Sequence, residues 1–95
     1  MNRLEELKNS KDWYNRLEYA RATGDWAHLK DDEDWDNRRE YAEATGDWEH
    51  LKNDEERYNR LRYAQATGDW AHLKNDKDSN NRDEAEHYLD LINQK

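Results

Sequence analysis

The sequence predicts an all-α protein, an α-solenoid of stacked short helix-turn-helix repeats. A unit of twenty-two residues recurs in three full copies, at 9–30, 31–52 and 53–74. Each copy carries the same Thr-Gly-Asp-Trp break, which divides it into a longer and a shorter helical segment. Five Trp and six Tyr carry most of the large apolar surface, and each unit can bury its apolar face only against its neighbours.

We expect 1–95 to be one repeat domain, with an N-terminal half-repeat cap at 1–8 and a C-terminal capping helix within 75–95. Leu4 and Leu7 take the places of Trp26 and Leu29, so residues 4–8 are predicted to form a trimmed short helix. Twelve positions are identical in all three full copies. In the first copy they are Asn15, Arg16, Tyr19, Ala20, Ala22, Thr23, Gly24, Asp25, Trp26, His28, Leu29 and Lys30.

Each longer helix is predicted to begin at a pair of capping residues and to end at the Thr-Gly break. The pairs are Asn9-Ser10, Asp31-Asp32, Asn53-Asp54 and Asn75-Asp76, with an acid in the capping-box position at Asp12, Asp34, Glu56 and Asp78. Gly24 suits the left-handed residue that ends a helix. Asp25 is then expected to cap a second, short helix that runs through Lys30.

The positions that vary between copies predict which side of the longer helix faces solvent. Positions 13, 14 and 17 accept Arg, Asp or Ser in other copies, so we expect them to be exposed. The buried stripe is then Asn15, Tyr19 and Ala22, flanked by Arg16, Ala20 and Thr23 and completed by Trp26 and Leu29.

At the C-terminal end the Thr-Gly break is missing. Residues 82–93 are therefore predicted to continue as one helix, with Ala85, Tyr88, Leu89 and Ile92 on the inward face.

The alternative fold is an up-down helical bundle, in which residues 25–44 form one helix. Its core stripe would run from Trp26 and Leu29 through Glu33, and Asp36 or Asn37, to Tyr41. The central turn of that stripe is too polar to line a bundle core, so the repeat arrangement is favoured.

The run Trp13-Tyr14-Asn15, followed by Tyr19-Ala20 and Gly24-Asp25-Trp26, resembles the first helix and turn of a tetratricopeptide repeat. The resemblance covers about fourteen residues of each unit, and the second helix is much shorter than that family's. It implies a stacked superhelix with a groove that binds extended peptides. The near-identity of the copies is typical of a designed or recently amplified array.

Charge and composition limit the classes of partner. The formal net charge of −8 repels phosphate backbones and anionic lipid, and no Lys- or Arg-rich stripe is present, so we expect no nucleic acid and no membrane partner. No apolar run is long enough to span a membrane, and the first residues lack the hydrophobic region of a signal peptide, so we expect a soluble protein without an export signal, cytoplasmic if expressed in cells.

The repeated polar residues favour structural roles. His28, His50 and His72 have acids three residues before and four after, so a divalent-metal array is a distant hypothesis, and a His bonded between repeats is the favoured one. Arg16 and its copies are expected to bridge to the Asp of the turn or to stack on Trp. Asn15 and its copies are expected to bond backbone between repeats.

No residue pattern indicates catalysis or cofactor binding, so we expect a non-enzymatic scaffold. Large apolar groups at variable positions predict a surface that contacts a protein or peptide, or a second copy of the chain. These candidates are Trp13, Tyr14, Leu17, Trp35, Tyr58 and Leu61. A purely structural array with no partner is the alternative.

Overall fold

The computed structural model of the protein describes residues 2–94, and every regular element in that range is a helix. The chain divides into two compact units, Met1–Asp47 and Trp48–Lys95. The first unit holds α1 (Arg3–Lys8), α2 (Trp13–Thr23), the 3₁₀ helix η1 (Trp26–Leu29) and α3 (Trp35–Thr45). The second holds η2 (Trp48–Leu51), α4 (Arg57–Thr67), η3 (Trp70–Leu73) and α5 (Ser79–Asn93). The predicted all-α repeat arrangement is confirmed. The bundle is excluded because a loop at 30–34 interrupts its long helix.

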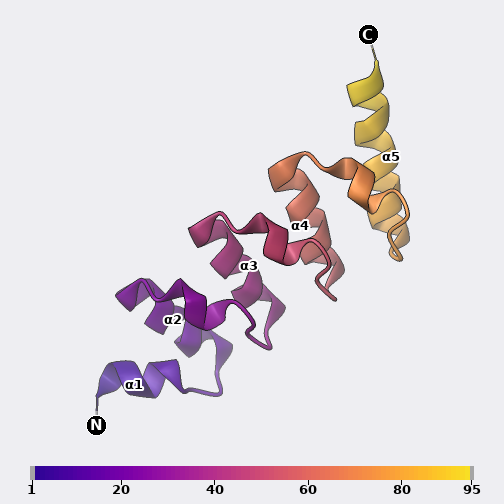
Figure 1. Ribbon diagram of the computed structural model, residues 1–95. Coiled ribbons are helices and arrows are strands. Elements are labelled where there is room, and N and C mark those ends of the chain that lie inside the picture. The colour runs from indigo at the N-terminus through magenta and orange to yellow at the C-terminus, as the bar shows by residue number, and fades with distance from the viewer. Residues whose placement is uncertain (1, 95) are drawn as a thin grey trace. The chain divides into compact units, whose positions relative to one another are not determined.

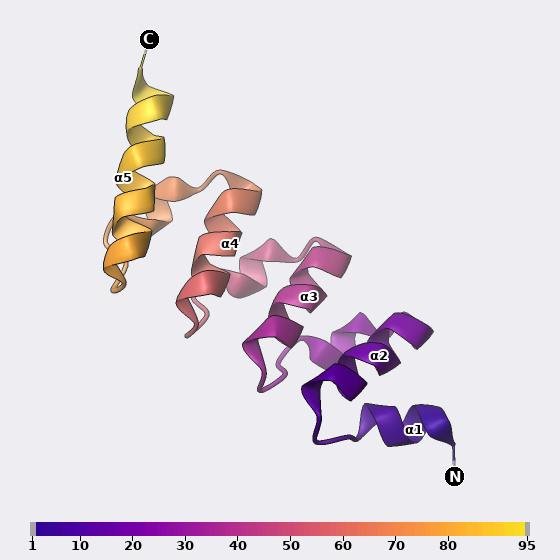
Figure 2. The ribbon, with the colours of Figure 1, turned by 180° about the vertical axis from the view of Figure 1, so that it is seen from behind.

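Within each unit, the short helices pack against the α-helices that precede and follow them. In the first unit α1 packs on α2, and η1 contacts both α2 and α3. In the second unit η2 contacts α4, and η3 contacts both α4 and α5. Figure 1 shows the short helices in front of the α-helices of their own unit, and Figure 2 shows the same units from behind with the α-helices in front. Each unit is therefore two layers deep.

Each longer helix begins two residues later than the sequence predicted. The N-cap is the acid itself, at Asp12, Asp34, Glu56 and Asp78. The residue two places earlier makes a separate turn: the Asp34 N–H donates to Asp32 Oδ1 at 2.9 Å, and the Asp36 N–H donates to Asp34 Oδ1 at 2.9 Å. At α3, two side chains two residues apart thus each accept an N–H bond, which orders the loop as well as the helix start, whereas the Glu56 side chain at α4 makes no capping bond.

A closed set of hydrogen bonds locks each Thr-Gly-Asp corner. The hydroxyl of Thr45 donates to the Tyr41 carbonyl at 2.8 Å, the Asp47 N–H donates to that hydroxyl at 3.2 Å, and the Tyr41 hydroxyl donates to Asp47 Oδ2 at 2.6 Å. Gly46 between them has φ of +77°, a left-handed conformation that favours glycine. The prediction that the Asp side chain caps the short helix is wrong, since neither Asp25 nor Asp69 makes that bond and both accept from the Tyr hydroxyl instead.

The core is made of small and aliphatic residues that recur once in each repeat. The fully buried apolar side chains are Ala20, Ala42, Ala64, Leu29, Leu51, Leu73 and Ala85. Two predictions about the buried face were wrong. Ala22 and Thr23 are exposed, because they lie on the last turn of α2, where the chain leaves the helix at Gly24. Leu17 is only 3% exposed, although its position carries Arg or Asp in other copies.

The two ends of the chain have the predicted elements but pack less fully than predicted. Leu4 and Leu7 lie on α1, with Leu7 partly covered and Leu4 exposed. In α5, Ala85 is buried and Tyr88 stacks on Trp70 with ring centroids 4.3 Å apart. Ile92 is 62% exposed, so the prediction that it faces inward is wrong. The reason is that α5 runs for 15 residues where α4 has 11, and its last turns pass beyond η3 (Figure 1).

Candidate binding surface

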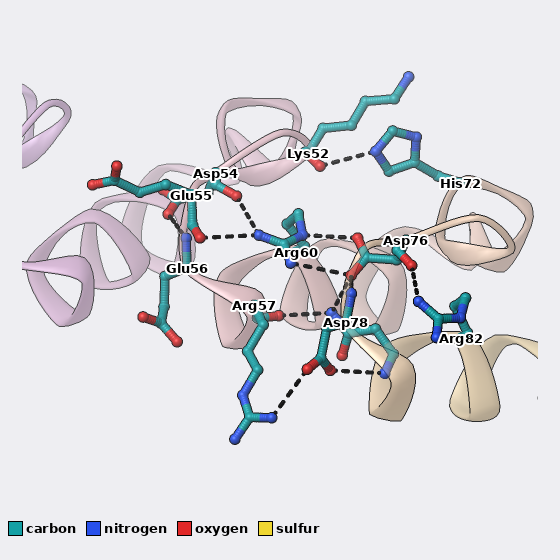
Figure 3. A network of polar contacts seen from close by, with 11 residues as sticks. Lys52, Asp54, Glu55, Glu56, Arg57, Arg60, His72, Asp76, Asp78 and Arg82 are labelled. Carbon is teal, nitrogen blue, oxygen red and sulfur yellow. Dashed lines mark hydrogen bonds and ion pairs between the residues drawn. The ribbon is translucent and has the colours of Figure 1, made fainter.

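Within each unit, an arginine on one α-helix bonds the loop that precedes the next α-helix. In the second unit the guanidinium of Arg60 donates to both carboxylate oxygens of Asp76, at 2.8 and 3.1 Å (Figure 3). The same guanidinium donates to the carbonyls of Asp54 and Glu55 in the loop before α4, at 2.8 and 3.1 Å. In the first unit Arg16 holds Asp32 in the same way, at 2.8 and 2.9 Å. One side chain therefore ties two loops together.

These arginine and aspartate pairs are ionised and largely shielded from water. Arg60 is 6% exposed. Burial by itself would raise the pKa of Asp76, but the bonds from Arg60 and from the Asp78 N–H outweigh that effect and lower it. The hydrogen bond to Asp76 raises the pKa of Arg60 against the opposing effect of burial. The carboxylate in the first unit, Asp32, also has a lowered pKa, for the same reasons.

The predicted bonds from asparagine and histidine side chains to backbone carbonyls between repeats are present at Asn37, Asn81, His28 and His72, whereas the Asn15 side chain donates to the Ser10 hydroxyl instead. The side-chain amide of Asn37 donates to the Trp13 carbonyl at 3.0 Å, and that of Asn81 donates to the Arg57 carbonyl at 3.0 Å. His72 Nε2 lies 2.9 Å from the Lys52 carbonyl (Figure 3), and His28 Nε2 lies 3.0 Å from the Lys8 carbonyl. These bonds fix the offset between successive helices inside each unit.

In the first unit, the predicted interaction residues lie at the starts of α2 and α3. Trp13 is 41% and Tyr14 48% exposed, and their rings meet edge to face with centroids 5.8 Å apart. Trp35 is half-buried on the corresponding first turn of α3. Leu17 is buried, so its side chain is not available to a partner. We call the pair Trp13 and Tyr14 the aromatic face.

In the second unit, the predicted residues lie on α4 beside α5. Tyr58 is 50% exposed and Leu61 is half-buried. Both line a small cleft of about 100 Å³ that Arg57 and Asp78 also border. The Arg57 guanidinium lies 4.8 Å from the centre of the Tyr58 ring, so part of this ring already binds a cation from the chain itself.

The described part of the chain offers neither a metal centre nor a membrane span. No group of three or more His, Asp or Glu side chains within residues 2–94 is placed to hold a metal ion. None of the helices formed by those residues is both long and apolar enough to cross a membrane.

Sequence reasoning missed the partners of the repeated arginines and tyrosines. Arg16 and Asp32 are sixteen residues apart, which is too far for a pair on one helix. The signal was present in the repeat itself, because Arg60 and Asp76 keep the same spacing and an Arg also stands at position 38 with an Asp at 54. Polar residues that recur together at a fixed long spacing indicate a bond between neighbouring repeats.

Comparison with known proteins identifies no relative: no family model matches the chain, and neither a curated protein nor a solved structure matches it.

Proposed function

We propose that the protein is a non-catalytic helical repeat scaffold that binds a protein or peptide segment through its aromatic face. The observation that carries the proposal is the exposure of Trp13 and Tyr14, at 41% and 48%, beside each other on the first turn of α2. Paired exposed aromatic rings are the side chains most enriched at protein interaction hot spots. Most of the other aromatic rings have structural partners, such as the Tyr41 hydroxyl on Asp47 and Trp70 on Tyr88.

The rigidity of the surroundings supports the same function. Trp13 lies directly after the N-cap Asp12, and its carbonyl accepts the Asn37 amide from α3. The helix that carries the face, α2, is thus held at a fixed offset from α3 by a part-buried hydrogen bond. A rigid aromatic surface loses little conformational entropy on binding, which favours affinity.

The test is selection of binding peptides from a random displayed library on the immobilised chain. Enriched peptides are expected to lose most of their affinity for a variant with Trp13→Ala and Tyr14→Ala. The matched control is Leu91→Ala with Ile92→Ala, which removes a more exposed apolar pair from α5 and should bind as the unaltered chain does. Circular dichroism should show unchanged helicity in both variants.

Two results would contradict the proposal. Peptides that bind the aromatic-face variant as well as the unaltered chain would place the interaction elsewhere. No enrichment, together with a solution mass that stays monomeric across concentration, would favour a structural array without a partner. If the mass instead rises with concentration and Trp13→Ala with Trp35→Ala suppresses the rise, the partner is a second copy of the chain.

A further inference from the structure

The second unit contains a complete arginine-binding arrangement, built from its own residues. Arg57 donates to Asp78 Oδ1 at 3.1 Å and to the Tyr58 hydroxyl at 3.0 Å. Its guanidinium also lies 4.8 Å from the centre of the Tyr58 ring. A carboxylate, a phenol hydroxyl and an aromatic ring therefore surround one guanidinium. Figure 3 shows the Arg57 side chain reaching toward the Asp78 carboxylate.

The first unit repeats this arrangement without the arginine. Residues two repeats of twenty-two apart occupy equivalent positions, so 57, 58 and 78 correspond to 13, 14 and 34. The backbone frame is the same in both units, since Asn37 bonds the Trp13 carbonyl and Asn81 bonds the Arg57 carbonyl at equal distances of 3.0 Å. Tyr and Asp are kept, and Trp13 stands where the arginine would be.

The groups that hold Arg57 in the second unit are open to a ligand in the first. The hydroxyl of Tyr14 makes no hydrogen bond to any residue from 2 to 94, and its ring has no cation over it there. The carboxylate of Asp34 accepts one bond, from the Asp36 N–H at 2.9 Å, whereas that of Asp78 accepts from both Arg57 and the Asn81 N–H. Trp13 adds a second exposed ring.

We infer that Trp13, Tyr14 and Asp34 form a site for an arginine side chain of a protein partner. The inference rests on the proposed function, since it names the chemistry that the aromatic face recognises. Ring faces attract a guanidinium, and the carboxylate supplies a charge-assisted hydrogen bond. The formal net charge of −8 draws a cationic segment toward the chain. A planar guanidinium stacks on rings and reaches an acceptor at the same time, which the ammonium of lysine does less well.

The experiment measures binding of a fluorescein-labelled peptide of alternating arginine and glycine by fluorescence anisotropy. Its uncharged citrulline analogue, which keeps the planar shape, and its lysine analogue serve as comparison probes. We expect the arginine peptide to bind about tenfold more tightly than the citrulline peptide, and more tightly than the lysine peptide. Equal binding of all three, or equal binding of the arginine and lysine peptides, would overturn the assignment.

Substitutions then locate the site. Asp34→Asn keeps a good helix cap and removes the charge, and it should reduce arginine binding to the citrulline level. The matched control is Asp83→Asn, which removes the same charge from an exposed position on α5 and should leave the affinity unchanged. Trp13→Arg should fill the site from within, as Arg57 does in the second unit, and abolish binding. Equal effects of the two Asp→Asn changes would show general attraction to an acidic protein and overturn the site.

A gain of function separates this inference from the proposed function. Arg57→Trp converts the second unit to the arrangement of the first, and it should add a second equivalent of bound arginine peptide. If no second equivalent binds, a Trp, Tyr and Asp in this arrangement are not sufficient to bind arginine, and the proposed site is wrong. If library peptides without arginine bind at the aromatic face and the arginine peptide does not, the arginine site is wrong and the binding function stands. If neither binds, both are wrong.

Discussion

Replacing Arg60 with methionine tests whether the repeats are joined as the geometry indicates. Arg60→Met keeps most of the apolar stem but removes four hydrogen bonds, two to the Asp76 carboxylate and two to loop carbonyls. The Asp76 side chain is 7% exposed and would keep its charge without its main partner. Breaking a buried ion pair from one side destabilises a protein by about 3–5 kcal/mol, which is a large share of the stability of a chain this size.

The repeat provides the control, because Arg82 stands at the same position in the last copy. Arg82 is exposed and, among the described residues, bonds only the Asp76 carbonyl, at 2.6 Å. We expect Arg82→Met to cost about 0.5–1.5 kcal/mol. Urea unfolding followed by far-ultraviolet circular dichroism gives both free energies. Adding Asp76→Asn to Arg60→Met should recover part of the loss, since it removes the stranded charge. Equal costs for Arg60→Met and Arg82→Met would refute this account of the junction.

Three further predictions concern the loops and corners. The pKa values of Asp32 and Asp76 are lower in the folded chain than in the unfolded chain, so as pH falls these carboxylates are protonated first in the unfolded chain. Stability should therefore fall as pH drops below their ordinary pKa value of 3.8. Urea midpoints measured against pH should fall less steeply for a variant with Asn at both positions. Hydrogen bonds to aspartate raise the pKa of Tyr41 and Tyr63, so the stability from those bonds is complete below the ordinary value of 10.0 and is lost as pH rises through the raised one. Ultraviolet titration should show a late-ionising phenol class, and a single class at the ordinary value would contradict the corner geometry. Gly46→Ala should cost about 1 kcal/mol from its φ of +77° alone, because no atom lies within 4 Å of the added Cβ, and thermal unfolding measures the loss.

Local chemistry explains which parts of the fold could be predicted. The ends of α2, α3 and α4 were predicted correctly, because glycine adopts the positive φ that ends a helix more easily than other residues do. Gly24 and its copies are the only glycines in the sequence. The predicted helix starts were two residues too early, because Asp32 and Asp34 both accept a backbone N–H bond. Either residue could be the N-cap as far as the sequence shows. Only the three-dimensional path of the loop distinguishes them.

Burial was harder to predict because it depends on the neighbours of each residue. Comparing copies suggested that position 17 faces solvent, yet Leu17 is buried while Asp83 at the same position of α5 is exposed. The same repeat position thus has different surroundings on α2 and on the terminal helix α5. Trp13 and Tyr14 were predicted as surface residues and are exposed. The arginine site, however, could be inferred only from the contact between Arg57 and the Tyr58 ring in the structure of the second unit.

The most direct test of the central claim is an NMR spectrum of the indole N–H groups of the five tryptophans, recorded while the arginine and glycine peptide is added. The indole N–H of Trp13 should shift in a saturable manner, and that of Trp70, which stacks on Tyr88, should stay in place. With Asp34→Asn, saturation of the Trp13 shift should require about tenfold more peptide, and the other signals should stay at their free positions. A Trp13 signal that does not respond, or a response centred on Trp48 and Trp70, would contradict the claim that the aromatic face of the first unit is the binding surface.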